Sequence, residues 1–359
     1  MKKLFFLIAV LISSVNQWSF GQASAPKYSN EFLNIGVGAR ALGMANVQAA
    51  TVNDVTAAYW NPAGLLNMKS KYEVALMHSE YFAGIAKYDY AAFATRLDSQ
   101  SVIALSIIRF GVDDIPDTRY LYDANGALNY NNVKYFSAAD YAFLFSYARE
   151  TKLIPGLQLG GSAKVIHRTV GQFANSWGFG IDAGAQYIRN KWKFGLMVRD
   201  ISTSFNAWSL NTSQLQDIYA STGNAPPQNS IEITLPKAIL GGARNFKLFK
   251  KMGLLAAIDL VSTFDGRRNV LIKSKTISID PMAGFELDYA KTVFLRFGVG
   301  NIQQVQDFNK GTVTTFQPNF GIGIRVSKIF IDYALTNVGS QGASSLYSNV
   351  FSLKLALNK

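Results

Sequence analysis

The chain has 359 residues, of which 49% are hydrophobic, 13% aromatic and 16% charged, and its formal net charge is +12. It contains no cysteine, which excludes disulfides and a lipid anchor on a cysteine. About a quarter of the residues of an ordinary soluble domain are charged, so this chain is unusually poor in charged residues. The basic residues are scattered and form no cluster interleaved with stacking aromatics, and we therefore predict no nucleic-acid partner.

The N-terminus has the features of a secretory signal peptide. Lys2 and Lys3 form a basic start, residues 4–12 are apolar, and Ala23-Ser24-Ala25 is a cleavage site of the small-x-small kind. The apolar run is too short to cross a bilayer, and no later run approaches the ~20 apolar residues of a membrane helix. We predict a cleaved signal peptide at residues 1–25 and no membrane helix after it.

Residues 32–65 form a segment rich in glycine and alanine that fits neither a long amphipathic helix nor a run of strands. Small side chains let the backbone pack closely, and glycines allow tight turns. Asn53 or Asp54 is placed to cap a short helix near residues 55–59, and Pro62 is expected to end that helix. The segment is either a plug inside a larger structure or an ordinary glycine-rich leader.

From Lys71 onward, apolar residues alternate with small or polar ones at a period of two, which is typical of β-strands. These segments run about nine to twelve residues, the length of a tilted strand that crosses a membrane, whereas ordinary strands have about five or six. Fourteen candidate strands begin near Lys71, Ala86, Ser101, Ser137, Gly156, Ala174, Lys191, Ile233, Met252, Ile277, Thr292, Phe316, Lys328 and Ser348.

Long and short connections alternate along the chain. A transmembrane barrel has this alternation because its inner turns are tight and its outer loops long, and a soluble sandwich has no reason to keep it. We therefore predict an all-β fold, a transmembrane antiparallel β-barrel of about 14 strands in the outer membrane of a Gram-negative bacterium. The predicted longer connections cover residues 80–85, 111–136, 168–173, 201–232, 262–276, 301–315 and 338–347.

The barrel prediction gives the glycine-rich segment a place. It precedes the first strand, and irregular backbone at membrane depth is tolerated only where protein surrounds it or it lines a cavity. We predict an N-terminal hatch, or plug, at residues 26–70 in the lumen, and the barrel at residues 71–359. The chain ends in Asn358-Lys359 and not in the aromatic residue with which many outer-membrane barrels end.

The predicted inward faces carry charges of both signs, so we expect ion pairs in the lumen in place of a one-sign ion filter. Arg40 of the hatch is a partner for one of the wall carboxylates, or it is solvated at the inner mouth. Asp89 and Arg109 are also predicted to face inward. The principal predicted lumen charges are Asp182, Arg199, Glu286, Arg296, Arg325 and Asp332.

The sequence shows no chemistry of an enzyme. His78 and His167 are the only histidines, and with no cysteine a zinc site built from these ligands is not expected. Ser79 follows His78, but neighbours on a strand point to opposite faces, which argues against a catalytic dyad. The chain has no G-x-S-x-G elbow and no P-loop lysine. We predict no catalytic residue, no metal and no cofactor.

The hatch segment resembles the N-terminal signature of the PorV/PorQ family, within the FadL-like superfamily of long-chain fatty-acid transporter barrels. The matching residues cover about a tenth of the chain. The matching positions are Gly38, Ala39, Arg40, Gly43, Met44, Asp54, Ala57, Trp60, Asn61, Pro62, Ala63 and Gly64. Ala45-Asn46 stands where the family usually has Gly-Gly or Gly-Asp, so the subgroup stays open.

The resemblance implies two functions. The first is a non-enzymatic partner in protein secretion or surface assembly, associated with the type IX secretion system, which contacts a translocon or exported proteins. The alternative is a FadL-like transporter of long-chain fatty acids or other hydrophobic molecules, passed through a hatch and lateral openings in the wall. Both place the chain among outer-membrane lipids, and the expected hatch disfavours an open diffusion pore.

Overall fold

The computed structural model describes residues 29–123, 125–152, 154–225, 228–306, 311–336 and 348–358. The predicted signal peptide and the first residues of the predicted hatch lie outside these ranges, so both stay predictions. Within the described ranges, no helix combines the length and the apolar character needed to span a bilayer.

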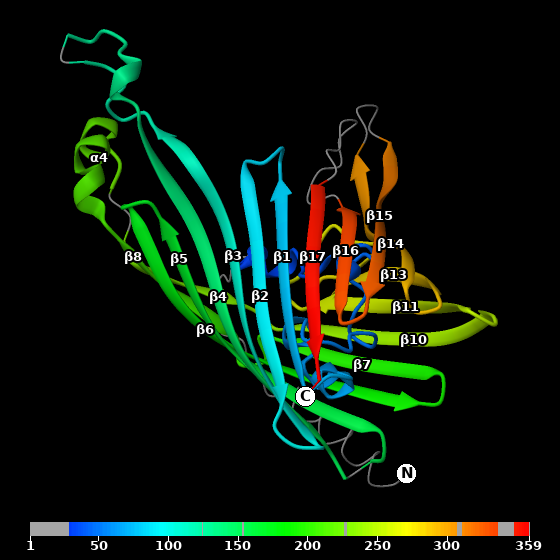
Figure 1. Cartoon of the computed structure of the whole chain (residues 1–359). Coiled ribbons are helices and arrows are strands. Elements are labelled where there is room, and N and C mark those ends of the chain that lie inside the picture. Colours follow the sequence, from blue (N-terminus) through cyan, green and yellow to red (C-terminus); the bar gives the residue numbers. More distant parts are fainter. Residues whose placement is uncertain are drawn as a thin grey trace.

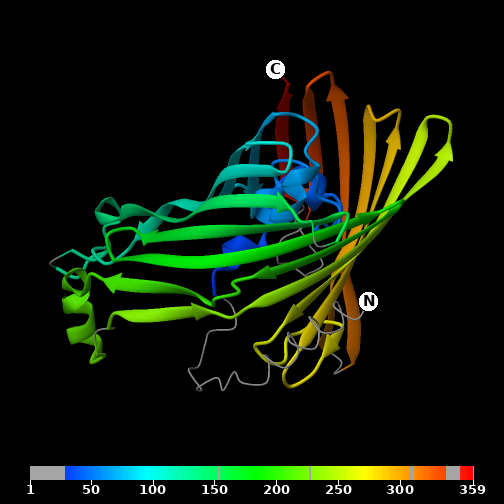
Figure 2. The same ribbon diagram turned by 90° about the horizontal axis from the view of Figure 1, so that it is seen from below.

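One antiparallel sheet closes on itself into a barrel (Figures 1 and 2). Fourteen strands form the wall, and β1 pairs with both β2 and β17, which confirms the predicted fold. The wall strands are β1 Tyr72–Tyr81, β2 Ala86–Arg96, β3 Ser101–Asp117, β4 Lys134–Glu150, β5 Leu157–Val170, β6 Ala174–Arg189, β7 Trp192–Arg199, β10 Lys237–Phe249, β11 Met252–Thr263, β13 Ser278–Tyr289, β14 Val293–Gln306, β15 Thr312–Val326, β16 Ile329–Thr336 and β17 Ser348–Leu357.

The predicted strand starts lie close to the observed ones, with one error. The segment predicted as a loop at residues 201–232 contains two further strands, which extend the wall beside β6. Residues 200–203 interrupt the alternation after β7, and the sequence pattern therefore predicts that the strand region ends there and that a loop follows. The shorter elements are β8 Ser204–Leu210, β9 Ser230–Thr234, β12 Ile272–Lys273, η4 Tyr130–Asn132, η5 Thr212–Leu215 and α4 Gln216–Thr222.

The two ends of the barrel differ in their connections. The short-turn end holds the turns β2–β3, β4–β5, β6–β7, β10–β11, β13–β14 and β15–β16, which join adjacent strands directly. The long-loop end holds the other connections, including residues 118–133 and the segment with η5 and α4. In a membrane barrel the short turns face the periplasm.

The two faces of the wall differ as the alternation predicts. On β4, Phe143 and Phe145 are exposed on the outside, while Ala142 and Ser146 are buried on the inside. The same division recurs around the wall, where the exposed large side chains are mostly Leu, Ile, Phe, Tyr and Trp. An apolar outer belt of this kind suits contact with lipid.

The prediction that Asp89 and Arg109 face the lumen is wrong. Asp89 and Arg109 contact each other at 3.4 Å on the outer face, while the neighbouring Tyr88 and Tyr90 are buried inside. The rule that polar residues face inward fails here because the hatch, and not water, fills the lumen at β2. Large aromatic rings therefore pack on the inner face of this strand.

The hatch lies inside the barrel (the blue segment in Figures 1 and 2) and belongs to its main core. Its residues Val37, Val55 and Leu65 are completely buried. The predicted helix near residues 55–59 is present as a single turn slightly later in the chain, and Pro62 begins the next turn. The hatch elements are η2 Glu31–Asn34, α2 Ala39–Leu42, α3 Ala57–Trp60 and η3 Pro62–Asn67.

Six inward-facing glycines of the wall let the hatch come into direct contact with the strands. We call them the glycine seats, because a Cβ built on any of them would lie less than 3.0 Å from a hatch atom. At Gly195 the Cβ would be 2.0 Å from the carbonyl oxygen of Ala49, and at Gly298 it would be 2.3 Å from the amide nitrogen of Ala45. The glycine seats are Gly160, Gly184, Gly195, Gly241, Gly284 and Gly298.

We predict that Gly195→Ala displaces the hatch and destabilises the folded protein by about 1–3 kcal/mol, the usual cost of overpacking a tight core. Gly242→Ala on the adjacent strand β10 is the matched control, because its Cβ would meet no atom within 4 Å. The measurement is the unfolding midpoint in detergent together with hydrogen exchange of the hatch amides. Equal midpoints for the two variants would show that the hatch does not rest on the seats.

Candidate functional site: the hatch and the cavities on either side of it

The predicted hatch motif holds the hatch segment to itself and to the wall. The indole N–H of Trp60 donates to the carbonyl oxygen of Val37 at 2.9 Å. The Asn61 side-chain amide donates to the carbonyl oxygens of Ala49 at 2.7 Å and of Ala185 in β6 at 3.1 Å. These bonds tie the two halves of the hatch together and fix them to the barrel.

The glycines and the proline of the motif occupy positions that exclude larger residues. Gly38 has a φ of +85°, and its amide lies 2.9 Å from the sulfur of Met77. A Cβ on Gly43 would lie 2.9 Å from the Cα of Gly321, and one on Gly64 would lie 2.6 Å from a hatch carbonyl oxygen. Pro62 starts η3, where the missing N–H costs no helical hydrogen bond.

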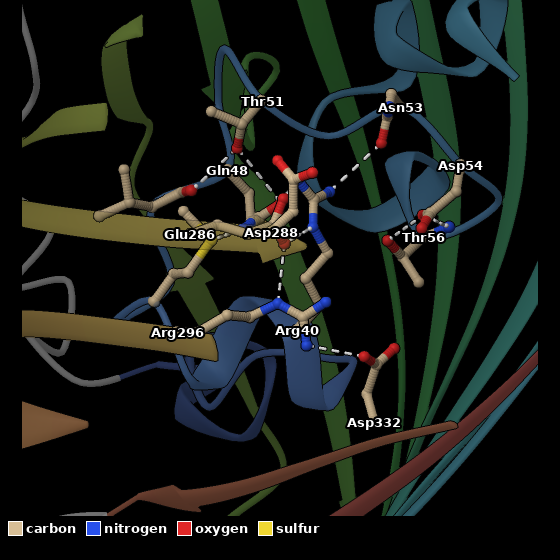
Figure 3. A network of polar contacts seen from close by, with 12 residues as sticks. Arg40, Gln48, Thr51, Asn53, Asp54, Thr56, Glu286, Asp288, Arg296 and Asp332 are labelled. Carbon is tan, nitrogen blue, oxygen red and sulfur yellow. Dashed lines mark hydrogen bonds and ion pairs between the residues drawn. The ribbon is translucent and has the colours of Figure 1, made fainter. Parts of the chain in front are cut away.

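Arg40 lies in an ion-pair network with three wall residues (Figure 3). Its guanidinium donates to both carboxylate oxygens of Glu286 in β13, at 2.8 and 3.2 Å. Arg296 of β14 donates to the same carboxylate at 2.7 Å and to Asp332 of β16 at 2.7 Å. Of the two positions that the sequence left open for Arg40, the structure places it on a wall carboxylate. We call Arg40, Glu286, Arg296 and Asp332 the latch network.

Asp54 forms a second ionic contact between the hatch and the wall. The ammonium of Lys354 in β17 lies 2.6 Å from its carboxylate, and the amide of Thr56 donates to it at 3.0 Å. Burial raises the pKa of Asp54, but the positive charges of Lys354 and Arg40 outweigh burial and lower it from 3.8 to about 2. The carboxylate is therefore ionised at neutral pH and holds the start of α3 against the wall.

Asp259 of β11 binds the hatch backbone, a role that the sequence did not predict. One oxygen of its carboxylate accepts the consecutive amides of Gln48 and Ala49, at 2.8 and 2.9 Å. Two neighbouring amides that converge on one carboxylate satisfy backbone donors that water cannot reach. An aspartate at an inward position of the apolar run in β11 was the signal that was available in the sequence.

The other predicted lumen charges lie apart from the latch network. Asp182 contacts Lys164 at 2.8 Å, and the same ammonium lies 2.6 Å from Asp200. Arg199 donates to the carbonyl oxygen of Leu33 at 2.9 Å. Arg325, by contrast, is exposed at the short-turn end and joins no ion pair within the described ranges. Lys164 and Asp200 were not predicted as lumen charges, because a lysine among apolar strand residues gives no sign of which carboxylate it will contact.

The Lys164–Asp182–Asp200 cluster lies beside an interruption of the wall. Residues 200–203 separate β7 from β8, and residues 235–236 separate β9 from β10. We call this place the wall break. The amide of Asp200 donates to the Asp182 carboxylate at 2.8 Å, and this bond holds the bent backbone beside β6.

A cavity of about 530 Å³ lies between the hatch and the long-loop end. We call it the outer cavity. Apolar side chains supply about half of its lining residues, and the rest are polar, among them the cations Arg199, Lys237 and Arg268 and the carboxylates of Glu31, Asp259 and Asp280. The cavity extends beside the wall break, where a small cavity of about 50 Å³ shares part of its lining. Residues shared by the two cavities are Glu31, Asn34, Tyr59, Arg199, Lys237, Thr263 and Arg268.

A second cavity, of about 320 Å³, opens at the short-turn end, and we call it the vestibule. It is lined by the latch network and by further cations, including Lys193 and Lys354. Among the residues that the structure describes, the outer cavity and the vestibule share no lining residue. The hatch therefore separates a mixed apolar and polar cavity, in which charges of the two signs balance, from a strongly basic one.

Comparison with known proteins identifies the fold. No family model matches the chain, and no curated protein matches its sequence. The solved toluene transporter TbuX of Ralstonia pickettii matches with a TM-score of 0.54 and 13% identity, over 90% of this chain and 99% of that one. The monoaromatic hydrocarbon channel CymD matches with a TM-score of 0.57 and 12% identity, over 90% of this chain and 98% of that one. The toluene transporter TodX of P. putida matches with a TM-score of 0.53 and 12% identity, over 90% of this chain and 99% of that one.

The chain shares the fold of these transporters. Membership in the FadL-like superfamily and in its PorV/PorQ branch, which the hatch signature implied, stays a prediction. The matched proteins are named as transporters or channels and not as enzymes. Identities of this size establish the fold and leave the function of this chain open.

We predict that Arg40→Gln loosens the hatch without unfolding the barrel. The change removes two charge-assisted hydrogen bonds to Glu286, which are worth about 1.5–3 kcal/mol, while Arg296 still neutralises that carboxylate. Hydrogen exchange of residues 39–50 measures the effect. Arg325→Gln is the control, since it removes the same charge from the same end. Equal exchange in the two variants would contradict a holding role for Arg40.

We predict that the hatch loses stability as the pH falls from about 4 towards 2. Because the pKa of Asp54 is lower in the folded protein than its ordinary 3.8, its contribution is complete above that value and disappears as the pH falls through about 2. Asp54→Asn should lower the free energy of unfolding by about 2 kcal/mol at pH 6, and it should remove the fall in stability between pH 4 and pH 2. Thermal unfolding between pH 6 and pH 2 measures it, with the exposed Asp114→Asn as the control. A parallel profile in both variants would contradict the assignment.

Proposed function

We propose that the chain is an outer-membrane channel for an apolar small molecule. The observation that carries the proposal is the outer cavity above the hatch, with its extension beside the wall break. Ligand sites in proteins commonly have volumes of about 300–1,000 Å³, and the outer cavity falls within this range.

Three features support a location in the outer membrane. The N-terminus has the features of a signal peptide, the barrel carries an apolar outer belt, and its fold occurs in a solved toluene transporter. In that orientation the short-turn end and the vestibule face the periplasm, and the outer cavity faces the cell exterior. The lipid around the belt is then the first partner of the chain.

The hatch directs the proposed route away from the barrel axis. It is hydrogen-bonded to strands on opposite sides of the lumen, for example to Ala185 in β6 and to Ser352 in β17. A molecule in the outer cavity therefore has a shorter way out through the wall than past the glycine seats. The wall break is our candidate for that lateral exit. There β9 pairs with β8, and β10 pairs with β7 and β11, so among the described strands no ladder joins β9 to β10.

The lining of the outer cavity suggests the class of molecule. Phe32, Trp60, Phe110 and Met282 offer aromatic and polarizable surfaces, which suit an aromatic hydrocarbon or another compact apolar compound. The matched channels are named for toluene and monoaromatic hydrocarbons. By analogy we propose the same class of substrate here, and long-chain fatty acids remain within the proposed range because Arg199 and Lys237 can hold a carboxylate.

A role in protein secretion of the PorV/PorQ kind is the second candidate. The observation in its favour is the extent of hatch packing, since the residues of the signature, among them Arg40, Trp60 and Asn61, are all engaged in holding the hatch closed. A permanently closed barrel would serve as a membrane partner of a translocon or of exported proteins. Under this hypothesis no molecule is transported through the outer cavity.

We predict that Val261→Trp blocks the outer cavity and lowers uptake several-fold. Val261 faces inward on β11 and lines the cavity, whereas the neighbouring residue Leu260 faces outward and is 37% exposed. Leu260→Trp adds the same ring on the lipid side and should leave uptake unchanged. The measurement is the initial rate of radiolabelled toluene or oleate uptake by bacterial cells that express each variant in an otherwise channel-deficient outer membrane.

The outcomes separate the two candidate functions. No uptake above empty-vector cells by the unmodified protein would contradict the channel. Equal uptake by the two tryptophan variants would show that the outer cavity is not on the route. Loss of exported proteins from the cell surface after deletion of the gene, with hydrocarbon and fatty-acid uptake unchanged, would favour the secretion role.

A further inference from the structure

The vestibule at the short-turn end has a large excess of positive charge. Eight cationic side chains line it, against three carboxylates from Glu73, Glu286 and Asp332. Four of the cations have no carboxylate within 4.0 Å among the residues described by the structure. We call these four, Lys69, Lys193, Arg325 and Lys328, the free vestibule cations.

The turns around the vestibule extend the positive surface. They add several lysines at the same end of the barrel, while the acidic residues of these turns are few, such as Asp98 and Glu150. Charges of one sign around a concave opening reinforce one another's field and attract counter-charged molecules. The lysines of these turns are Lys152, Lys191, Lys250 and Lys251, and Lys247 lies near the end of β10 beside them.

The geometry selects the kind of anion. Lys193 lies on an inward position of β7, between the outward-facing Trp192 and Phe194, so lipid headgroups outside the wall cannot neutralise it. A single small anion is also a poor match, because the positive charge is spread over a cavity of about 320 Å³ and the turns beyond it. An extended chain with several carboxylates matches both the spacing and the sign.

We propose that the vestibule is a docking site for an acidic polypeptide segment of a periplasmic partner. The proposal rests on the orientation given under the proposed function, with the short turns in the periplasm. Carboxylates of the segment pair with the free vestibule cations, and the chain backbone fills the opening below the hatch. Leu255, Phe294 and Phe330 offer apolar contacts to its side chains within the same cavity.

Docking in the vestibule brings the partner to the latch network. Arg40, Glu286, Arg296 and Asp332 all line the vestibule, and none of them lines the outer cavity. A carboxylate held near Lys193 therefore competes with Glu286 for Arg40 from the periplasmic side. The docked segment weakens the ion pair that holds α2 against the wall, and the hatch becomes more mobile.

The test uses the full mature chain in nanodiscs of a zwitterionic lipid. The probe is a fluorescein-labelled peptide of alternating Glu and Gly, about twelve residues long, which spans about 40 Å when extended. We expect saturable binding by fluorescence anisotropy that weakens between about 50 and about 300 mM salt. A peptide with Gln in place of Glu should not bind.

The variants distinguish the vestibule from the rest of the basic end. Lys193→Gln with Arg325→Gln should weaken binding about tenfold, whereas Lys250→Gln with Lys251→Gln removes the same charge from a turn and should cost less than about threefold. The unheated mobility of each variant in gels verifies that the barrel is folded. Equal losses in the two double variants, or equal binding of the Gln peptide, would overturn the proposal.

Hydrogen exchange supplies a readout that adsorption to the rim would not produce. With the Glu peptide bound, the amides of residues 39–47 should exchange faster, and the double variant at Lys193 and Arg325 should abolish this effect. Unchanged exchange, or full displacement of the peptide by inorganic phosphate at an equal concentration of charge, would also overturn it. These measurements involve no transport. A negative result here would contradict the docking proposal and not the proposed channel, and a negative uptake assay would contradict the channel and not the docking.

Discussion

The space inside the wall is the constraint on which the rest of this structure depends. Eight strands enclose a lumen that their own side chains can fill, but fourteen enclose considerably more. The hatch fills this space, and its irregular backbone must then find hydrogen-bond partners away from water. The carboxylate of Asp259, the amide of Asn61 and the hydroxyls of Ser146 and Ser162 provide such partners. The glycine seats follow from the same constraint, because the hatch backbone must come close to the strands to form hydrogen bonds with them.

The position of the hatch in the lumen determines where charged side chains are paired and where they are solvated. The latch network and the Lys164–Asp182–Asp200 cluster beside the hatch form ion pairs. Arg199 and Asp259 are hydrogen-bonded to the hatch backbone instead, because a charge without any partner away from water is costly. Above the hatch the lining is mixed apolar and polar, and below it water can solvate the free vestibule cations. The hatch thus divides one lumen into two chemical environments, and our two proposals assign each environment its own kind of ligand.

The alternation of side chains, a local property, predicts most of the barrel. Strand starts, parity of the connections and the plugged lumen could all be read from residue order, because a strand shows its two faces every second residue. Partnerships across the lumen could not, since Arg40 and Glu286 are 246 positions apart and meet only through the register of the whole wall. Asp89 was misplaced for a related reason, because which face of β2 meets the hatch depends on hatch packing. The wall break disguised β8 and β9 by interrupting the same alternation.

The contacts of the hatch with β17 bear on the order in which the molecule assembles. The amide of Ala39 donates to the hydroxyl of Ser352, and Lys354 binds Asp54, across 313 and 300 positions of sequence. Contacts of such separation form late, because the entropy of closing a long loop must be overcome first. The segment that is synthesised first is therefore among the last to reach its final place. Until the last strand joins the first, this glycine-rich stretch lacks the wall contacts that satisfy its buried backbone groups.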